Sequence, residues 1–442
     1  MGRILSALLI VALMGSAFAG IAWAEEVAAS DGMRDMIREE IKAYHEDQKT
    51  DFRVYWKNGL NMKSGDGNFT LKIGGRIMAD FVFFDDYDEN LETAVDGEWH
   101  SGFEFRRARL YMSGTIYKYV AFKAQFDFAT GDADFKDMWV GLRGQDCLGC
   151  MFPDITVGHF KEYFSLEELT SSKYITFMER ALPVTTFAPS RNSGLGLFRD
   201  FYGSRATLGL GVFGNSNDYG NHEWRDGYNI TGRATFLPWA PCDCESHFLE
   251  IGVSASYKGD LRTLRYRTRP DGTHIGPRIV DTGNFDADSA ILLGGEIAFQ
   301  YDRWHFQGEY ITSMVDSVEA DDPTYYGYYA EASYMLLGGT RPFKRAYATF
   351  NRVKPCTNLW AKDCCGFGGL EIAARYSTVD LDEGLVQGGT AKDITVGLNW
   401  YLNPNTVVKL NYAYVDVENA HGEGAIGDGQ INVFGTRFQV DF

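Results

Sequence analysis

The sequence predicts an all-β protein, a 16-stranded antiparallel transmembrane β-barrel with a short N-terminal periplasmic helix. From about residue 68 onward, runs of some ten residues alternate apolar and polar side chains and are separated by turns or loops. The chain contains 31 Phe, 25 Tyr, 9 Trp and 49 Gly but only 11 Pro, and its last run ends on Phe442. Such runs and aromatic girdles are typical of barrels in outer membranes, where every backbone group must be hydrogen-bonded within the protein.

Residues 1–24 have the pattern of a secretory signal peptide. Arg3 supplies the positive start, Ile4 to Met14 form an apolar stretch, and Ala22-Trp23-Ala24 is a small-x-small cleavage site. Cleavage after Ala19 is the weaker choice. An N-terminal membrane anchor is the alternative, but the apolar stretch is shorter than the roughly 20 residues that a spanning helix needs.

Residues 25–67 are expected to form a periplasmic N-terminal segment with a helix over residues 31–49. Apolar residues recur there at spacings of three and four, and Asp31 is suited to the N-cap. The apolar stripe is narrow, so the helix either self-associates as a short coiled coil or lies against the barrel. The apolar residues of the stripe are Met33, Met36, Ile37, Ile41 and Tyr44.

The barrel is expected to occupy residues 68–442. An even number of strands places both ends of the barrel on the periplasmic side, so short turns fall there and long polar connections fall outside. The expected long outer connections are 258–289, 314–324, 379–390 and 417–429. A row of soluble β-sandwiches would show domain linkers instead. The expected strands are 69–83, 102–117, 121–129, 135–142, 155–160, 194–200, 204–214, 227–237, 247–257, 290–301, 303–313, 325–336, 367–378, 391–401, 405–416 and 430–442.

Alternation along the strands directs acids and bases in similar numbers into the lumen. A net charge of -18 makes nucleic acid an unsuitable partner. In Arg106-Arg107-Ala108-Arg109 a strict alternation would turn a charge toward lipid, so a β-bulge or an interface position is needed. The bases are Lys72, Arg76, Lys123, Arg205, Arg233, Arg375, Lys409 and Arg437; the acids are Asp80, Asp127, Asp137, Glu250, Glu296, Glu309, Glu331 and Glu371.

Several segments resemble the phosphate-selective porins O and P. The resemblance implies a trimeric porin whose third loop folds inward and narrows the pore, and whose lumenal bases conduct anions; Arg107 and Arg109 occupy matching positions. Tyr163 stands where the family pattern has proline, which leaves the entry to the loop open to a different geometry. The segments are 52–60, 105–110 (Phe-Arg-Arg-Ala-Arg-Leu), 119–123, 157–162 (Val-Gly-His-Phe-Lys-Glu), 164–167, 174–180 and 187–192.

The connection 161–198 is too long for a turn and is rich in charge. Charges held inside a barrel act at short range in a poorly screened space. Lys161 and Lys173 are therefore expected to touch permeating anions, whereas Glu179, Arg180 and Arg191 are expected to anchor the loop to the wall. The remaining pore-lining candidates are Arg76, Arg107, Arg109, Lys123, Arg205, Arg233 and Arg375.

Seven cysteines lie in three connections that the strand assignment places at the periplasmic rim. Disulfides are the expected state in an oxidising compartment; an odd count leaves one free thiol or an intermolecular bond. A metal site is the alternative, whereas the absence of His after Cys150 argues against haem attachment. The disulfide candidates are Cys147, Cys150, Cys242, Cys244, Cys356, Cys364 and Cys365.

The sequence thus predicts a porin in the outer membrane of a Gram-negative bacterium, passing small hydrophilic solutes, with anions such as phosphate the leading class. Expected partners are the lipid bilayer, lipopolysaccharide, two further copies in a homotrimer, and the barrel assembly machinery through the strand ending at Phe442. No catalytic group stands out, so neither an enzyme nor a cofactor is expected. The alternative function is a structural barrel that holds a periplasmic partner at its cysteine-rich rim.

Overall fold

The computed structural model describes residues 38–40, 42, 51–85, 87–95, 98–147, 152–223, 227–241, 245–271, 273–318, 321–360, 366–421 and 426–442. The predicted signal peptide lies outside these residues, and of the predicted helix 31–49 only residues 38–40 and 42 are described, all of them helical. The chain divides into two compact units, Met1–Phe52 with Ser64–Asp66, and Arg53–Lys63 with Gly67–Phe442. Within the described residues, no helix is both long enough and apolar enough to cross a bilayer.

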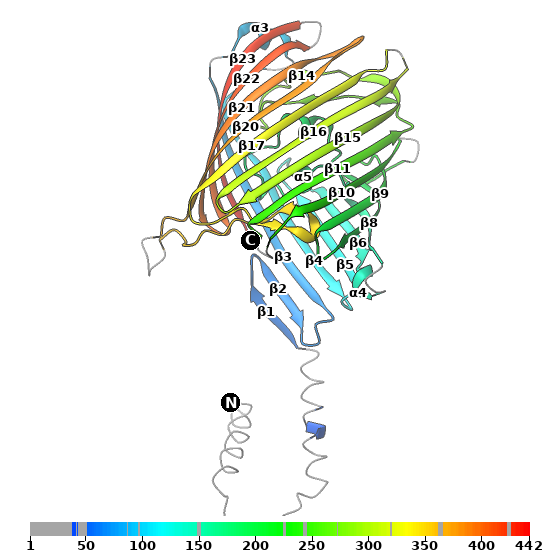
Figure 1. Cartoon of the computed structure of the whole chain (residues 1–442), viewed down its shortest axis with the longest axis vertical. Helices are drawn as coiled ribbons and strands as arrows, with labels where there is room; N and C mark the ends of the chain where they lie inside the picture. Colours follow the sequence, from blue (N-terminus) through cyan, green and yellow to red (C-terminus); the bar gives the residue numbers. More distant parts are fainter. Residues whose placement is uncertain are drawn as a thin grey trace, which may run out of the picture. The chain divides into compact units, whose positions relative to one another are not determined.

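The second unit is a closed antiparallel barrel of sixteen strands, as predicted (Figure 1). Each strand pairs with the next, and β23 pairs with β3 to close the wall. The barrel strands are β3 (Thr70–Asp85), β4 (Gly102–Ile116), β5 (Val120–Asp127), β6 (Asp134–Leu142), β7 (Asp154–Lys161), β8 (Arg191–Phe201), β9 (Ala206–Gly214), β10 (Tyr228–Trp239), β11 (His247–Gly259), β15 (Phe285–Tyr301), β16 (Trp304–Ser317), β17 (Thr324–Leu337), β20 (Gly369–Glu383), β21 (Val386–Asn403), β22 (Thr406–His421) and β23 (Ile426–Asp441).

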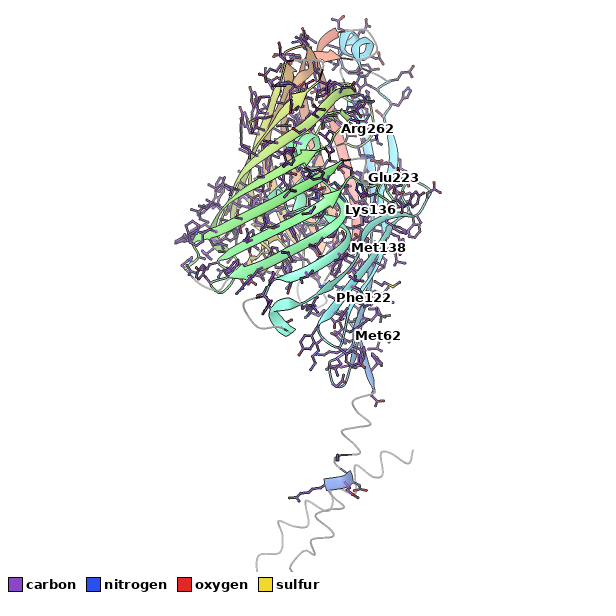
Figure 2. All side chains as sticks on the ribbon, turned by 90° about the vertical axis from the view of Figure 1, so that its right-hand side faces the viewer. Met62, Phe122, Lys136, Met138, Glu223 and Arg262 are labelled. Atoms are coloured by element: carbon purple, nitrogen blue, oxygen red, sulfur yellow. The ribbon has the colours of Figure 1, made fainter. Side chains whose placement is uncertain are left out.

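The alternation that predicted the strands sets which side chains face the lumen. On β3, Ile77 and Phe81 are 47% and 40% exposed on the outer face, whereas Arg76 and Asp80 are 6% and 1% exposed on the inner face. Figure 2 shows side chains on both faces of the strands, with Phe122 of β5 and Met138 of β6 among those labelled. Successive strand residues point to opposite faces of a sheet, so one face can meet lipid and the other the pore.

A β-bulge occurs where the cluster of arginines required one. Met78 pairs with Arg107 and Ala79 pairs with Phe105, so Arg106 has no partner across the β3–β4 ladder. The extra residue changes the phase of the alternation. As a result Arg106, Arg107 and Arg109 all turn inward, and each forms an ion pair with a buried carboxylate.

Two of the long outer connections predicted from the sequence are wrong. The ladder between β20 and β21 continues to the pair Glu383↔Val386, so 379–390 contains only a two-residue turn in which Gly384 has φ +66°. Likewise β22 and β23 extend into 417–429. On these extensions the alternation is inverted: Leu381 and Val417 are buried on the inner face, whereas Glu383 and Glu418 are exposed. The outward apolar alternation therefore ends before the hydrogen-bonded strands do.

The remaining short elements lie before the barrel or in the connections between its strands. The β11–β15 connection (residues 260–284) and the β17–β20 connection (residues 338–368) carry several of them. They are β1 (Phe52–Trp56), β2 (Leu60–Ser64), α3 (Glu89–Ala94), α4 (Gly144–Cys147), α5 (Leu166–Leu169), α6 (Leu182–Phe187), β12 (Thr263–Leu264), β13 (Arg267–Thr268), β14 (Val280–Asp281), β18 (Phe343–Lys344), η2 (Arg345–Tyr347) and β19 (Thr349–Phe350).

Candidate functional site: a basic path through a partly filled lumen

The connection between β7 and β8, residues 162–190, folds into the lumen and is called the constriction loop below. Its backbone is held by side chains of the far wall: the amides of Leu166 and Glu167 donate to the Glu309 carboxylate at 3.1 and 2.8 Å. The loop turns locally because Ser165 caps α5 by accepting from the amide of Glu168. The predicted loop 161–198 is too long at its end, because β8 begins at Arg191 and pairs with β7.

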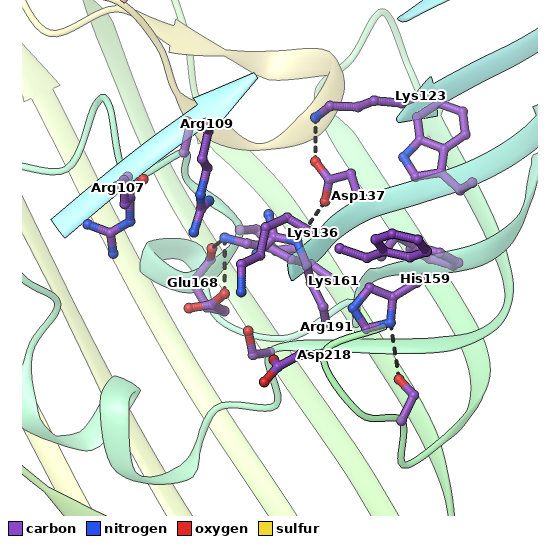
Figure 3. Close-up of a pocket in the computed structure, with 18 of the residues that line it drawn as sticks. Arg107, Arg109, Lys123, Lys136, Asp137, His159, Lys161, Glu168, Arg191 and Asp218 are labelled. Atoms are coloured by element: carbon purple, nitrogen blue, oxygen red, sulfur yellow. Dashed lines mark hydrogen bonds and ion pairs between the residues drawn. The ribbon is translucent and has the colours of Figure 1, made fainter. Parts of the chain in front are cut away.

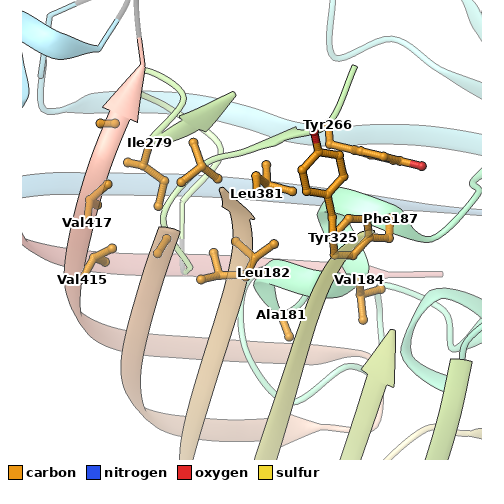
Figure 4. Packing of buried hydrophobic residues seen from close by; sticks show 14 of the residues in the cluster. Ala181, Leu182, Val184, Phe187, Tyr266, Ile279, Tyr325, Leu381, Val415 and Val417 are labelled. Atoms are coloured by element: carbon orange, nitrogen blue, oxygen red, sulfur yellow. The ribbon is translucent and has the colours of Figure 1, made fainter. Parts of the chain in front are cut away.

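An apolar cluster joins the constriction loop to the barrel wall (Figure 4). Helix α6 packs there against the 260–284 connection and the wall strands β16, β17 and β20. Burial of such side chains is the main stabilising contribution to any protein core. The labelled members are Ala181, Leu182, Val184 and Phe187 from the loop, Tyr266 and Ile279 from the 260–284 connection, and Tyr325, Leu381, Val415 and Val417 from the wall.

Ion pairs fix the loop to the wall around Glu179. Its carboxylate accepts two hydrogen bonds from Arg106, at 2.9 and 3.0 Å, and one from Arg437 at 2.6 Å. Arg107 approaches the same carboxylate at 3.4 Å. Arg180 instead folds back on its own loop, donating to the carbonyls of Glu167 and Glu168 at 3.0 and 3.1 Å. Arg191 donates to Asp137 at 2.8 Å, which joins β8 to β6.

Three of the predicted pore-lining bases lie away from open space. Arg375 pairs with Asp271 at 2.8 Å and Arg233 with Glu296 at 2.5 Å, and both side chains are buried. Arg205 was expected inside a strand, but it lies in the turn before β9 and donates to the carbonyl of Ala240 at 2.9 Å. The alternation predicted the inward direction of Arg233 and Arg375 but could not show that carboxylates and the apolar cluster enclose them.

Open space remains along β3 to β8 as three adjoining cavities. The middle cavity, about 640 Å³, is lined by nine Lys or Arg and three Asp or Glu. The inner cavity, about 810 Å³, is lined by seven bases and one acid, and the outer cavity, about 250 Å³, by four bases and two acids. The middle cavity shares Arg106 and Arg180 with the outer one and Arg76 and Lys123 with the inner one. The three cavities therefore adjoin one another in a row, called the basic path below, and bases outnumber acids in each.

Most bases of the middle cavity are held by carboxylates (Figure 3). Lys123 and Arg191 share Asp137, Lys161 pairs with Glu168 at 3.0 Å, and Arg109 pairs with Asp127 at 2.6 Å. His159 bonds through Nδ1 to the hydroxyl of Ser216 at 3.1 Å. Because two bases share Asp137, that cluster keeps a net positive charge and can present hydrogen-bond donors to an anion in the cavity.

Arg76 is the exception because hydroxyl groups hold it. Its Nη1 donates to Ser172 Oγ at 2.8 Å and to Ser171 Oγ at 3.3 Å, and within the described part of the chain it forms no ion pair. The side chain is 6% exposed and lines both the middle and the inner cavity. Arg76 and the constriction loop thus face each other where the two cavities meet.

The two loop lysines that the sequence singled out both line the path, and both have carboxylate partners. Lys161 lines the middle cavity and pairs with Glu168. Lys173 lines the inner cavity and pairs with Asp441 at 3.1 Å. Burial lowers the pKa of Lys173 to about 8; Arg76 and Arg352 act in the same direction, and Asp441 opposes them. Its charge is therefore easier to lose than that of a surface lysine.

Sequence reasoning missed the basic residues of the connections. Arg341, in the 338–368 connection, donates to Glu371 at 2.6 Å and to the carbonyl of Tyr174 at 2.9 Å. Arg352 in the same connection donates to Asp441 at 2.8 Å, and Arg269 and Arg278 line the outer cavity. These connections are long and contain several arginines, and a simple turn needs neither. That pattern could have indicated that the connections contribute to the lumen.

Most of the cysteines predicted to lie at the periplasmic rim fall outside the described residues, namely Cys150, Cys242, Cys244, Cys364 and Cys365. Cys356 is exposed and carries no disulfide in the described part of the chain. Strand alternation places its connection and those of Cys147 and Cys242 on the same side of the barrel. No group of three or more metal-ligating side chains occurs among the residues that the structure describes.

A closed barrel with an apolar outer face, an inward-folded loop and a charged lumen defines an outer-membrane porin. Residues 71–442 match the family model of the phosphate-selective porins O and P, and the chain belongs to that family. Porin O of Pseudomonas aeruginosa is 28% identical over 435 residues, covering 89% of this chain and 93% of that protein.

Solved structures share the fold at low sequence identity. The anion-selective porin from Comamonas acidovorans superposes with a TM-score of 0.51 at 12% identity, covering 85% of this chain and 100% of that one. The trimer form of OmpT, an outer membrane protein of Vibrio cholerae, superposes with a TM-score of 0.51 at 11% identity, covering 84% and 99%.

Proposed function

We propose that this porin conducts small anions, phosphate among them, along the basic path lined by β3 to β8. The observation that carries the proposal is the continuity of the three cavities, in each of which bases outnumber acids. Low-dielectric walls strengthen the field of such charges and exclude cations. Membership of the phosphate-selective porin family and the similarity to the anion-selective porin from Comamonas acidovorans support the same solute class.

Within this proposal Arg76 is the main anion-binding residue, assisted by Arg106, Arg107, Arg109 and Lys123. An arginine held by neutral hydroxyls keeps its full charge, and its planar fork matches the oxygens of phosphate. Lys161, the last residue of β7, and Lys173 of the constriction loop would contribute further donors. The carboxylate pairs of Glu179 and Arg180 would hold the loop in position, and Arg191 would hold the wall beside it.

The assembly and delivery of the protein follow the same proposal. Residues 1–24 would direct export, and the final strand with Phe442 would be read by the barrel assembly machinery. The mature protein would form a homotrimer in a bilayer that contains lipopolysaccharide; the trimer form of OmpT supports this assembly for the fold. A structural barrel that holds a periplasmic partner is less well supported, because the lumen retains a continuous path.

The test is reconstitution in planar bilayers and measurement of the reversal potential in a KCl gradient. We expect the sign that indicates chloride preference, and we expect added phosphate to reduce the chloride current by competing for the path. Cation selectivity would overturn the anion proposal. Absence of conductance from correctly folded protein would overturn the pore itself.

A further inference from the structure

The cavities along the path differ in their aromatic content. The outer cavity has no Phe, Tyr or Trp, the middle cavity has four, and the inner cavity has nine. Inorganic anions are strongly hydrated and gain nothing from flat apolar walls, which cannot replace the lost water. An aromatic lining beside bases is therefore suited to a solute that has both an apolar ring and a charge.

The junction of the middle and inner cavities combines these two chemistries in a small space. Two of the residues that line both cavities are basic and two are aromatic. The six shared residues are Arg76, Lys123, Trp139, Leu169, Ser171 and Tyr347. Arg76 and Ser171 are bonded to each other, and Trp139 and Tyr347 line the same two cavities as they do.

The aromatic rings at the junction are already arranged for stacking. Tyr347 lies parallel to Phe198, with ring centroids 5.6 Å apart and an interplanar angle of 5°, and Lys344 Nζ lies 3.9 Å from the Tyr347 centroid. Tyr347 is nevertheless 49% exposed. Trp139 is half-buried and, among the described residues, makes no ring–ring or cation–π contact. Trp139 can therefore offer a ring face to a solute, and Tyr347, already stacked on Phe198, can offer the part of its ring that remains exposed.

Packing beneath the constriction loop explains some of the inner aromatic residues but not these two. Tyr163 contacts Phe198 and the β8–β9 wall, which supports the loop. Trp139 and Tyr347 are not members of the buried apolar clusters. A purely structural role would bury them, as it buries Phe343 and Phe350 nearby.

We propose that the junction binds aryl phosphate monoesters, with the phosphate on Arg76 and Lys123 and the ring against Trp139 and Tyr347. The proposal rests on the anion function above and extends it from inorganic oxyanions to flat organic ones. Offset stacking of aromatic rings adds to affinity beyond simple burial. The apolar ring can lose its water without a compensating hydrogen bond, while the phosphate accepts hydrogen bonds from the charged side chains.

The test compares block of the chloride current by phenyl phosphate, methyl phosphate and cyclohexyl phosphate at one pH. The pH is set to about 8, well above the second pKa of about 6 of a phosphate monoester, so that all three esters are dianions; the cyclohexyl ring is apolar but not flat. We expect phenyl phosphate to half-block the current at a concentration about threefold or more below that of either other ester. Equal half-blocking concentrations for the phenyl and cyclohexyl esters in the unmodified protein would overturn the proposal, with no variant needed.

Two variants then locate the binding position. Trp139→Leu and Tyr347→Leu remove a flat face but keep an apolar side chain, and we expect both to bring the phenyl-to-methyl ratio toward one. Tyr202→Leu is the matched control, because Tyr202 is 84% exposed in the β8–β9 turn and lines none of the three cavities; its ratio should stay that of the unmodified protein. A ratio unchanged in both junction variants would overturn the assignment. The reversal potential of the unmodified protein tests the anion function separately, so either proposal can fail alone.

Discussion

At the scale of single residues, the partner of a lumenal base decides what the base can do. Arg233 and Arg375 are buried beside carboxylates that cancel their charge. Arg76 has only hydroxyl partners, so its field extends into the two cavities that it lines. At short range in a poorly solvated space, such a charge acts more strongly than one at the surface.

Replacing Arg76 by Gln is expected to weaken phosphate binding at least about tenfold, because a hydrogen bond to a charged group contributes about 1.5–3 kcal/mol. The change should also reduce anion selectivity. Phosphate block and the reversal potential in planar bilayers measure both effects. Stability should change little, since the substitution removes a buried charge that has no counter-ion.

The matched control is Arg205→Gln, which removes an arginine from a turn outside the path. We expect no change in block or selectivity from it. Equal effects of the two substitutions would show that net charge, and not the position of Arg76, sets the preference for anions.

The alternation in the sequence predicts which way a strand residue points but not what it meets. It predicted that Arg76, Arg233 and Arg375 point into the lumen. Of these three arginines, Arg76 lines two cavities, whereas Arg233 and Arg375 lie in a filled region. The difference depends on Asp271 and on the apolar residues of α6, which are distant in sequence and reach the same place only after folding. Lys161 and Lys173 show the same limit, because Glu168 and Asp441 pair with them.

At the scale of elements, Tyr163 sets how the constriction loop leaves the wall. Its side chain lies over Gly209 and Gly196, where an added Cβ would come within 2.7 Å of Tyr163 Cγ and 2.8 Å of Tyr163 Oη. Glycine at these two positions therefore makes room for a tyrosine where the family pattern has proline. At the start of the loop, the Tyr163 ring packs against strands β8 and β9 at the positions of these two glycines.

Gly209→Ala is expected to displace Tyr163 and to destabilise the barrel by about 1–3 kcal/mol, the usual cost of overpacking. Unfolding in detergent measures the stability, and single-channel conductance reports the shift of the loop. Gly295→Ala is the control, because a Cβ there meets nothing within 4 Å. Equal stability of the two variants would show that the loop adapts without strain.

Strands were easier to predict than connections for a physical reason. Lipid on one side and the lumen on the other impose a period of two on every strand, and all sixteen were found. Above the membrane the lipid no longer requires apolar side chains on the outer face, so the ladder that continues to Glu383 and Val386 left no outward apolar signal. The inward position of Arg341 depends on a partner, Glu371, that the local sequence does not indicate.

At the scale of the whole molecule, the barrel depends on the seam between its first and last strands. Arg437 of β23 and Asp80 of β3 are partners across that seam and share two hydrogen bonds, at 2.7 and 2.6 Å. Both side chains are buried. The same arginine holds Glu179 of the constriction loop, so closure of the barrel and placement of the loop share one residue.

Asp80→Asn is expected to destabilise the folded barrel by about 3–5 kcal/mol, because it removes one partner of a buried pair. Denaturant unfolding in detergent measures the loss. Asp281→Asn is the control: it breaks the pair with Arg265, which is 37% exposed, and exposed pairs contribute about 1 kcal/mol or less. A loss at Asp80 no larger than that at Asp281 would contradict the role of the seam.

The uneven filling of the lumen has a consequence for engineering. The three cavities draw their wall residues from β3 to β8, and no described residue of the later barrel strands lines them. The barrel strands that line the cavities are therefore confined to one side of the wall, where Arg106 and Arg107 also hold the constriction loop. A designer could replace other cavity-lining residues of β3 to β8, for example to build a sensor for another anion, and leave the later strands unchanged.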